Sequence, residues 1–290
     1  MDKFELAIEN YSKAIKSSSS RNDQWWFWHL RLGEAYKHRG EYVKALPYLK
    51  KGLGREQDDY SNIKYQLGHY YLYIGDYSKA LKYLNESLHG TVGCQVAWQI
   101  RRCPQVQGKF QEALNFTDSI CEVENCELTC NRAYFELYTL FGEFEIAEKY
   151  FYRWQEMGHW LAAMIYVNYQ IGYVYDRLGK KIEAKKTFEE QIEVIQSEIN
   201  IGDTQGKRGH LHSARIYAYL GEKEKAFKNL IKYANAGFHW GWHDYILIDP
   251  FFESLRNDPE FLAIVRKAQD EKAAIRAQIK EMEERGELDL

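Results

Sequence analysis

Residues 68–84 read GHYYLYIGDYSKALKYL, and this stretch contains the pattern that decides the fold. A small residue, Gly68, is followed three residues later by Tyr71; a second glycine, Gly75, then precedes an aromatic residue and Ala80. Apolar residues recur at helical spacing on both sides of Gly75. Because glycine adopts the left-handed conformation that ends many helices at no steric cost, the stretch predicts two helices joined by a tight turn.

The same pattern recurs along the chain. Its copies are Gly40-Tyr42-Ala45, Gly75-Tyr77-Ala80, Gly108-Phe110-Ala113 and Gly142-Phe144-Ala147, with Gly179-Ala184 and Gly221-Ala226 lacking the aromatic residue and Phe4-Ala7 supplying the end of one more. Successive alanines lie 33 to 42 residues apart. This interval is close to the period of about 34 residues that helix-turn-helix repeats show. We expect each alanine to lie where two helices cross closely, because a larger side chain would force them apart.

A small residue also stands twelve positions before most of these alanines, and a tyrosine follows it three residues later. The small residues are Gly33, Gly68, Gly172 and Ala214, and the tyrosines are Tyr36, Tyr71, Tyr138, Tyr175 and Tyr217. This combination of small and aromatic positions resembles the tetratricopeptide repeat family. The resemblance implies an all-α fold, a right-handed α-solenoid superhelix of helix-turn-helix repeats. It covers residues 1–236, as one half repeat and six units. Because the chain starts inside a unit, we expect it to be the C-terminal piece of a longer protein.

Two segments depart from the repeat pattern. The third unit has Arg101 in place of the small residue and Pro104 in place of the tyrosine. Since proline removes a backbone hydrogen bond, a kinked or shortened helix is expected there. Residues 200–208 (NIGDTQGKR) lengthen the last interval and are predicted to form a polar connector.

Residues 237–290 follow a different pattern and are predicted to form a C-terminal helical cap. Asp249-Pro250 and Asp258-Pro259 each place a capping aspartate before a proline, which is typical of a helix start. The residues expected to cover the open end of the solenoid are Phe251, Phe252, Leu255, Phe261, Leu262 and Val265. This ending resembles that of bacterial tetratricopeptide proteins in which the array follows a signalling or regulatory module. The resemblance implies a bacterial regulator or sensor.

The last helix, from Ala268 to Arg285, is highly charged. Its few apolar residues are Ile275, Ile279 and Met282. A solvated capping helix is the favoured interpretation. A short coiled-coil contact that joins a homodimer is the alternative.

Charge and composition limit the classes of partner and compartment. A formal net charge of -3 gives no general attraction to nucleic acid or to an anionic membrane, so neither nucleic-acid binding nor membrane insertion is expected. The N-terminus lacks the layout of a signal peptide. Five cysteines, an odd number, lie between Cys94 and Cys130. We expect reduced thiols and a cytoplasmic location, although the mature part of an exported protein would look similar.

Candidate metal and catalytic groups are few. Cys121, Cys126 and Cys130 lack the short spacing of zinc sites, so buried thiols are favoured over metal. The histidine pairs His210/His212 and His239/His243 are interpreted as packing groups rather than ligands. Phosphate-loop, dinucleotide and hydrolase motifs are absent from the sequence. No cofactor, metal or enzymatic activity is therefore predicted, with an enzyme using residues 237–247 as a weaker alternative.

The remaining candidate is the concave face of the solenoid, which the first helices of the repeats line. Transfer of the family's groove positions gives Tyr65, His69, Tyr73, Trp98, Arg102, Arg132, Tyr166, Tyr169, Tyr173, Arg177, Arg208, Arg215 and Tyr219. Tyrosine and arginine are enriched at binding hot spots. We therefore expect a protein-protein interaction scaffold that binds a partner domain or an extended peptide with acidic or aromatic side chains. Two alternatives remain open: the tyrosines serve only in helix packing, or the face receives a small molecule or saccharide.

Overall fold

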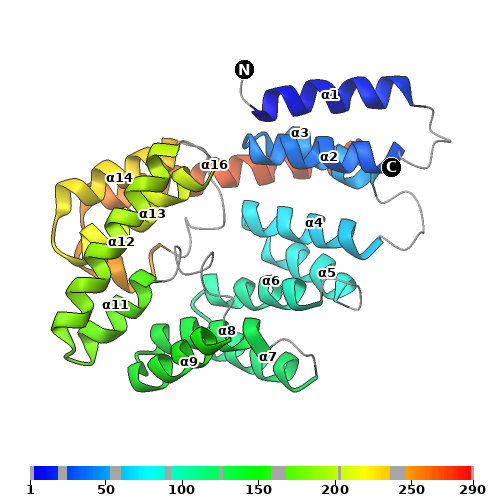
Figure 1. Ribbon diagram of the computed structural model, residues 1–290. Helices are drawn as coiled ribbons and strands as arrows, with labels where there is room; N and C mark the ends of the chain where they lie inside the picture. The colour runs from blue at the N-terminus through cyan, green and yellow to red at the C-terminus, as the bar shows by residue number, and fades with distance from the viewer. Residues whose placement is uncertain are drawn as a thin grey trace. The chain divides into compact units, whose positions relative to one another are not determined.

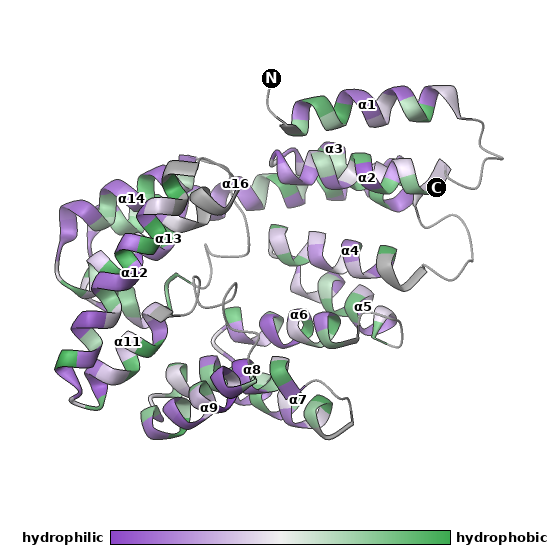
Figure 2. Cartoon of the chain, in the orientation of Figure 1, coloured by the Kyte–Doolittle hydropathy of each residue, from purple (hydrophilic) through white to green (hydrophobic). Residues whose placement is uncertain are grey.

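The computed structural model describes residues 3–18, 25–52, 60–88, 93–123, 127–157, 168–201, 204–235 and 246–288, which contain fifteen helices and no strand (Figure 1). In chain order the helices are α1 (Lys3–Ser17), α2 (Trp25–His38), α3 (Tyr42–Lys51), α4 (Tyr60–Ile74), α5 (Tyr77–Ser87), α6 (Gly93–Val106), α7 (Phe110–Val123), α8 (Glu127–Phe141), α9 (Phe144–Glu156), α11 (Asn168–Arg177), α12 (Lys181–Ile201), α13 (Thr204–Tyr219), α14 (Lys223–Asn235), the 3-10 helix η1 (Pro250–Leu255) and α16 (Pro259–Glu284). Hydrophobic and hydrophilic residues alternate along these helices (Figure 2). None of the described helices is long and apolar enough to cross a membrane.

Neighbouring helices pack as helix-turn-helix hairpins. The hairpins are α2/α3, α4/α5, α8/α9, α11/α12 and α13/α14. In the second of them, Gly75 has a φ of +76° and the Asp76 amide donates to the Tyr71 carbonyl at 3.0 Å. The five other predicted turn glycines have φ between +74° and +81°. The predicted glycine turns and the all-α solenoid of helix-turn-helix repeats are thus confirmed.

The close helix crossings are confirmed as well. Ala45, Ala80, Ala113 and Ala147 are fully buried. On the facing helix, a Cβ atom added to Gly68 would lie 2.6 Å from Leu84 Cγ. This separation is below any ordinary carbon contact, so the hairpin requires a residue without a side chain at this position.

Stacked tyrosine pairs recur at one position of the hairpins, which the sequence pattern did not predict. The pairs are Tyr36/Tyr48, Tyr71/Tyr83 and Tyr138/Tyr150, with ring centroids 5.5 to 5.7 Å apart and interplanar angles of 2° to 19°. In each pair the first-helix tyrosine packs on a second-helix tyrosine twelve residues later. Lysines lie over three of these rings, with Lys79 Nζ 5.4 Å from the Tyr71 centroid. The tyrosines therefore join the two helices of a hairpin.

The chain divides into two compact units. Unit 1 comprises residues 1–103, 237–242 and 267–290; unit 2 comprises residues 104–236 and 243–266. The division falls inside the irregular third repeat, between Cys103 and Pro104. Helix α6 continues through Pro104 and ends at Val106, so the proline lies in its last turn. The predicted domain boundary at 236/237 follows the repeat pattern, differs from this division, and stays a prediction.

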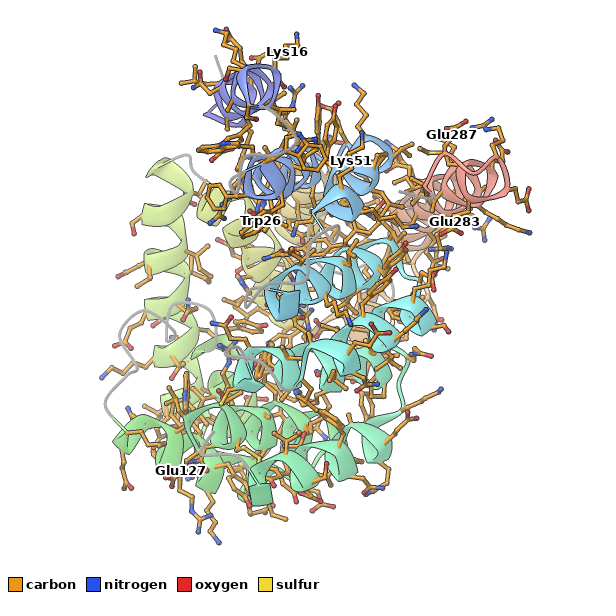
Figure 3. The ribbon with its side chains drawn as sticks, turned by 90° about the vertical axis from the view of Figure 1, so that its right-hand side faces the viewer. Lys16, Trp26, Lys51, Glu127, Glu283 and Glu287 are labelled. Atoms are coloured by element: carbon orange, nitrogen blue, oxygen red, sulfur yellow. A yellow bond between two sulfur atoms is a disulfide. The ribbon has the colours of Figure 1, made fainter. Side chains whose placement is uncertain are left out.

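In unit 1 the later part of α16 packs on the chain's own helices. Arg276 Nη1 donates to the Ile74 carbonyl at 2.5 Å, and Lys79 Nζ lies 2.7 Å from the carboxylate of Glu283. Glu283 is labelled on α16 in Figure 3. Ile279 is only 2% exposed, and Ile275 is half-buried. The arrangement favours a capping helix, because the apolar residues considered for a dimer contact already pack within one chain.

Two predictions about connections and thiols are wrong. Cys121 and Cys130 form a disulfide, and Cys94 is also disulfide-bonded, so the cysteines are not all reduced. Cys103 is buried and takes no part in a disulfide, and burial raises the pKa of its thiol to about 12. The predicted connector at residues 200–208 is largely helical, since α12 extends to Ile201 and α13 begins at Thr204. Residues 204–208 form the start of α13, which packs against α12, and tertiary packing of this kind supplies most helical stability in proteins.

Candidate functional site

In unit 2, six side chains from three elements form a cluster that we call the cap cluster. Helix α11 contributes Tyr169 and Tyr173, α13 contributes Arg215 and Tyr219, and η1 with its N-cap contributes Asp249 and Phe251. On each of the two α-helices the members are four residues apart, which places them on one face. The first four residues belong to the predicted concave face, whereas Asp249 and Phe251 belong to the cap.

An ion pair holds one side of the cap cluster. Arg215 Nε donates to Asp249 Oδ2 at 2.6 Å, and the two side chains are 8% and 2% exposed. The other carboxylate oxygen accepts the Phe251 amide at 3.1 Å, so Asp249 also caps η1 as the Asp-Pro pattern predicted. Buried charges are tolerated only when they are paired and hydrogen-bonded, and this carboxylate is both.

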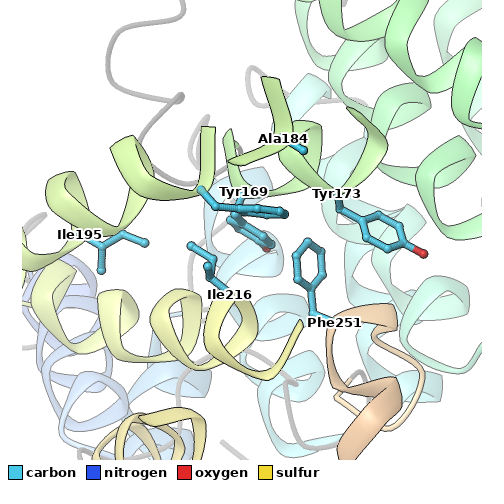
Figure 4. Close-up of a cluster of buried hydrophobic side chains, with 7 residues drawn as sticks. Tyr169, Tyr173, Ala184, Ile195, Ile216 and Phe251 are labelled. Atoms are coloured by element: carbon cyan, nitrogen blue, oxygen red, sulfur yellow. The ribbon is translucent and has the colours of Figure 1, made fainter. Parts of the chain in front are cut away.

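Contacts between aromatic rings form the rest of the cap cluster. The Phe251 ring reaches from η1 between Tyr169 and Tyr173, with centroid separations of 5.0 and 5.1 Å (Figure 4). The Tyr219 ring lies 5.5 Å away. Burial raises the pKa of Tyr169 to about 12, and the Tyr219 hydroxyl donates to Asp176 Oδ2 at 2.6 Å. Offset and edge-on contacts at these distances stabilise aromatic clusters beyond area burial alone.

A small recess lies beside the cap cluster. Its lining residues are Glu136, Thr139, Leu140, Gln170, Asp249, Pro250 and Phe251, and its volume is about 10 Å³. That volume accommodates about one water molecule. Gln170 Oε1 is buried and has no hydrogen-bond partner in the described part of the chain. Pro250 lines the same recess and has no backbone N–H to offer to that oxygen.

The other predicted residues of unit 2 lie outside the cap cluster. Arg132 Nε lies 3.2 Å from Glu136 Oε1, and Arg177 Cζ lies 5.3 Å from the centroid of the Phe144 ring. Arg132 is half-buried, whereas Arg177 is exposed. Tyr166 and the side chain of Arg208 lie outside the described residues.

The predicted residues of unit 1 form a second group along α4 and α6. His69 stacks on Tyr65 at 5.7 Å and meets the edge of Tyr73 at 4.7 Å. Tyr73 is buried, whereas Tyr65, Trp98 and Arg102 are half-buried.

Sequence reasoning missed two basic residues of this group. Lys37 Nζ donates to Gln66 Oε1 at 3.1 Å, and burial lowers the pKa of this lysine to about 8. Arg101 Cζ lies 4.2 Å from the centroid of the Trp98 ring. The only available signal for Arg101 was its place at the small-residue position of the third repeat.

Among the described residues, no group of three or more His, Cys, Asp or Glu side chains is placed to hold a metal ion. His210 Nδ1 lies 3.0 Å from Asn229 Oδ1, and the ring of His212 lies 5.1 Å from that of Tyr169. Both histidines therefore have packing or hydrogen-bonding neighbours. His239 and His243 lie outside the described residues.

The match to known families falls on two of the hairpins. A family model described as tetratricopeptide repeat matches residues 61–88 and 165–197, which include most of α4/α5 and α11/α12. These two segments match the tetratricopeptide repeat. No curated protein matches the sequence.

Solved structures with a similar fold are tetratricopeptide-like proteins. A tetratricopeptide repeat protein from Parabacteroides merdae is 17% identical with a TM-score of 0.57, covering 88% of this chain and 93% of its own. The apo form of RapI is 12% identical with a TM-score of 0.56, covering 88% and 99%. A Rap protein complexed with Competence and Sporulation Factor is 12% identical with a TM-score of 0.52, covering 97% and 94%. At these identities the similarity shows the fold alone.

Proposed function

We propose that this chain is an interaction scaffold that binds a peptide segment or partner domain through the first helices of its repeats. We call the accessible predicted residues on these helices the first-helix surface of each unit: Tyr65, Trp98 and Arg102 in unit 1, and Arg132 and Arg177 in unit 2. Tetratricopeptide folds generally mediate protein-protein interaction, which supports this class of function.

The observation that carries the proposal is the combination of accessibility and fixed geometry on this surface. Arg132 is held by Glu136, and Arg177 lies over the ring of Phe144. Tyr65, Trp98, Arg102 and Arg132 are half-buried, and Arg177 is exposed. A surface whose arginines and aromatic rings are already ordered loses less entropy on binding, and arginine offers planar, bidentate donors to a carboxylate.

The fold neighbours are consistent with a peptide ligand. One of them is a Rap protein complexed with Competence and Sporulation Factor. For this chain, recognition of a segment remains our proposal and rests on the first-helix surface. The recess of about 10 Å³ is too small for a saccharide, so that alternative gains no support from it.

Capture of a partner from native lysate with the full chain tests the proposal. The defined partner should be lost when Trp98 and Arg102 are changed to alanine, and weakened when Arg132 and Arg177 are changed. Lys185→Ala serves as the control, because its side chain is 77% exposed on the second helix α12. Equal recovery by all variants, or no defined partner, would contradict the proposal.

Finer aspects of the function remain proposals. A role within a larger bacterial regulator or sensor rests on the resemblance of the Asp-Pro cap. The proposal of a homodimer through α16 loses support, because Ile279 is already buried within its own chain. The proposal of a cytoplasmic location loses support from the Cys121–Cys130 disulfide, since such bonds persist mainly in oxidising compartments.

A further inference from the structure

Residues 249–251, which we call the cap segment, present a carboxylate and an aromatic ring to the repeat helices α11 and α13. We infer that residues 249–251 act as an intramolecular ligand of α11 and α13, and that they compete with a partner segment in which an aromatic ring follows a carboxylate by two residues. The inference rests on the proposed function and specifies the chemistry and the regulation of one part of it.

The ion pair between Arg215 and Asp249 resembles the way in which a protein binds a carboxylate of a separate ligand. Arg215 extends from a first helix, and its guanidinium meets Asp249, which lies outside the repeats. Its Cζ atom also lies 5.6 Å from the centroid of the Tyr169 ring. An arginine supported by an aromatic face and directed at a carboxylate is a common arrangement in acidic-motif recognition.

The ring of Phe251 fills a site formed by side chains of the first helices α11 and α13. Phe251 contacts rings from α11 and α13 and is 3% exposed. Tyr169 and Tyr173 are themselves 4% and 6% exposed. A partner therefore reaches these rings only after η1 moves away.

Tethering favours the chain's own segment in the unliganded chain. A segment attached to its own binding site acts at an effective concentration of about 1 mM or more. An outside segment must overcome this competition, and its apparent affinity falls by the fraction of chains in which η1 is displaced. Weakening η1 should therefore strengthen binding of the outside segment.

A labelled peptide of residues 246–256, titrated into the full chain, tests the inference. Phe251→Ala should bind the peptide at least about tenfold more tightly than the unmodified chain, because its own segment competes less well. Adding Arg215→Ala should abolish this gain. Leu262→Ala, a truncation of an exposed residue on α16, should bind as the unmodified chain does. Equal affinity for Phe251→Ala and the unmodified chain, or a gain that survives Arg215→Ala, would overturn the inference.

Hydrogen exchange of the unmodified chain avoids dependence on variants that fold poorly. An excess of isotopically labelled peptide should accelerate amide exchange at residues 251–255, and unchanged exchange at saturating peptide would overturn the inference. A lysate partner recovered equally by the unmodified chain and Phe251→Ala would also overturn it while leaving the proposed function in place.

Discussion

Arg215 Nε lies 2.6 Å from Asp249 Oδ2, and this contact joins a repeat helix to the cap across 34 residues of sequence. The pair is buried, and it fixes η1 so that Phe251 enters the tyrosine cluster (Figure 4). One contact thus determines both the stability of the cap and the access to the rings behind it.

Arg215→Ala should destabilise unit 2 by about 3–5 kcal/mol, because it leaves the Asp249 carboxylate buried without its partner. Chemical denaturation followed by circular dichroism measures the change. Lys225→Ala is the matched control, since its side chain is 59% exposed and its ion pair lies at the surface. A loss below about 1 kcal/mol for Arg215→Ala would show that the pair is not essential.

Lys272 should lower the stability of unit 1 near neutral pH. The lysine is 1% exposed, its Nζ lies 3.9 Å from the centroid of Tyr42, and burial lowers its pKa to about 7. Glu271 favours the charged form and Arg276 disfavours it. Lys272→Met should therefore raise the free energy of unfolding at pH 7 by roughly 1–2 kcal/mol.

The pH dependence follows from the direction of that pKa shift. Between the folded pKa near 7 and the unfolded pKa of 10.5, the unfolded chain binds more protons at Lys272, so stability rises with pH in this window. Lys37, with a pKa lowered to about 8, contributes in the same direction. The melting temperature of Lys272→Met should exceed that of the unmodified chain at pH 7, and the difference should shrink by pH 9.5. A difference that is constant with pH would refute this origin.

Gly68→Ala should destabilise the α4/α5 hairpin by roughly 1–3 kcal/mol, because its Cβ would lie 2.6 Å from Leu84 Cγ. Gly40→Ala separates crowding from backbone strain. Gly40 has a φ of +79° and no atom within 4 Å of an added Cβ, so its change should cost only about 1 kcal/mol. Thermal unfolding compares the two, and an equal loss would mean that close helix approach is not what requires Gly68.

Reduction should destabilise the connection between α7 and α8. Cys121 and Cys130 are nine residues apart, and closure of so short a loop contributes at most about 3 kcal/mol. Dithiothreitol should lower the melting temperature of the unmodified chain by more than that of Cys121→Ser/Cys130→Ser. Alkylation of all five cysteines without prior reduction would contradict the disulfide.

The hairpins were predictable because their determinants are local. Gly75 and Ala80 act within one repeat, and their spacing specifies the turn and the crossing directly. The cap was predictable only in part: Asp249 and Phe251 have the expected capping and burial, but Leu262 is 38% exposed instead of covering the repeats. It lies on the outward side of α16, next to the buried Phe261.

The pairings within the cap cluster were not predictable from sequence. The partner of Arg215 lies 34 residues away, beyond any helical spacing, and a surface arginine and a buried one look alike in sequence. Lys272 was missed for a similar reason, since lysine is rarely buried and nothing in the charged helix marks it. The odd number of cysteines favoured free thiols, although four of the five were available to pair.

Hydrogen exchange of the full chain with and without its captured partner tests the central claim most directly. The account predicts slower exchange on the first helices α4, α6, α8 and α11, which carry the first-helix surface, and unchanged exchange on α5, α9 and α12. Slower exchange confined to α5, α9 and α12 would contradict binding through the first helices.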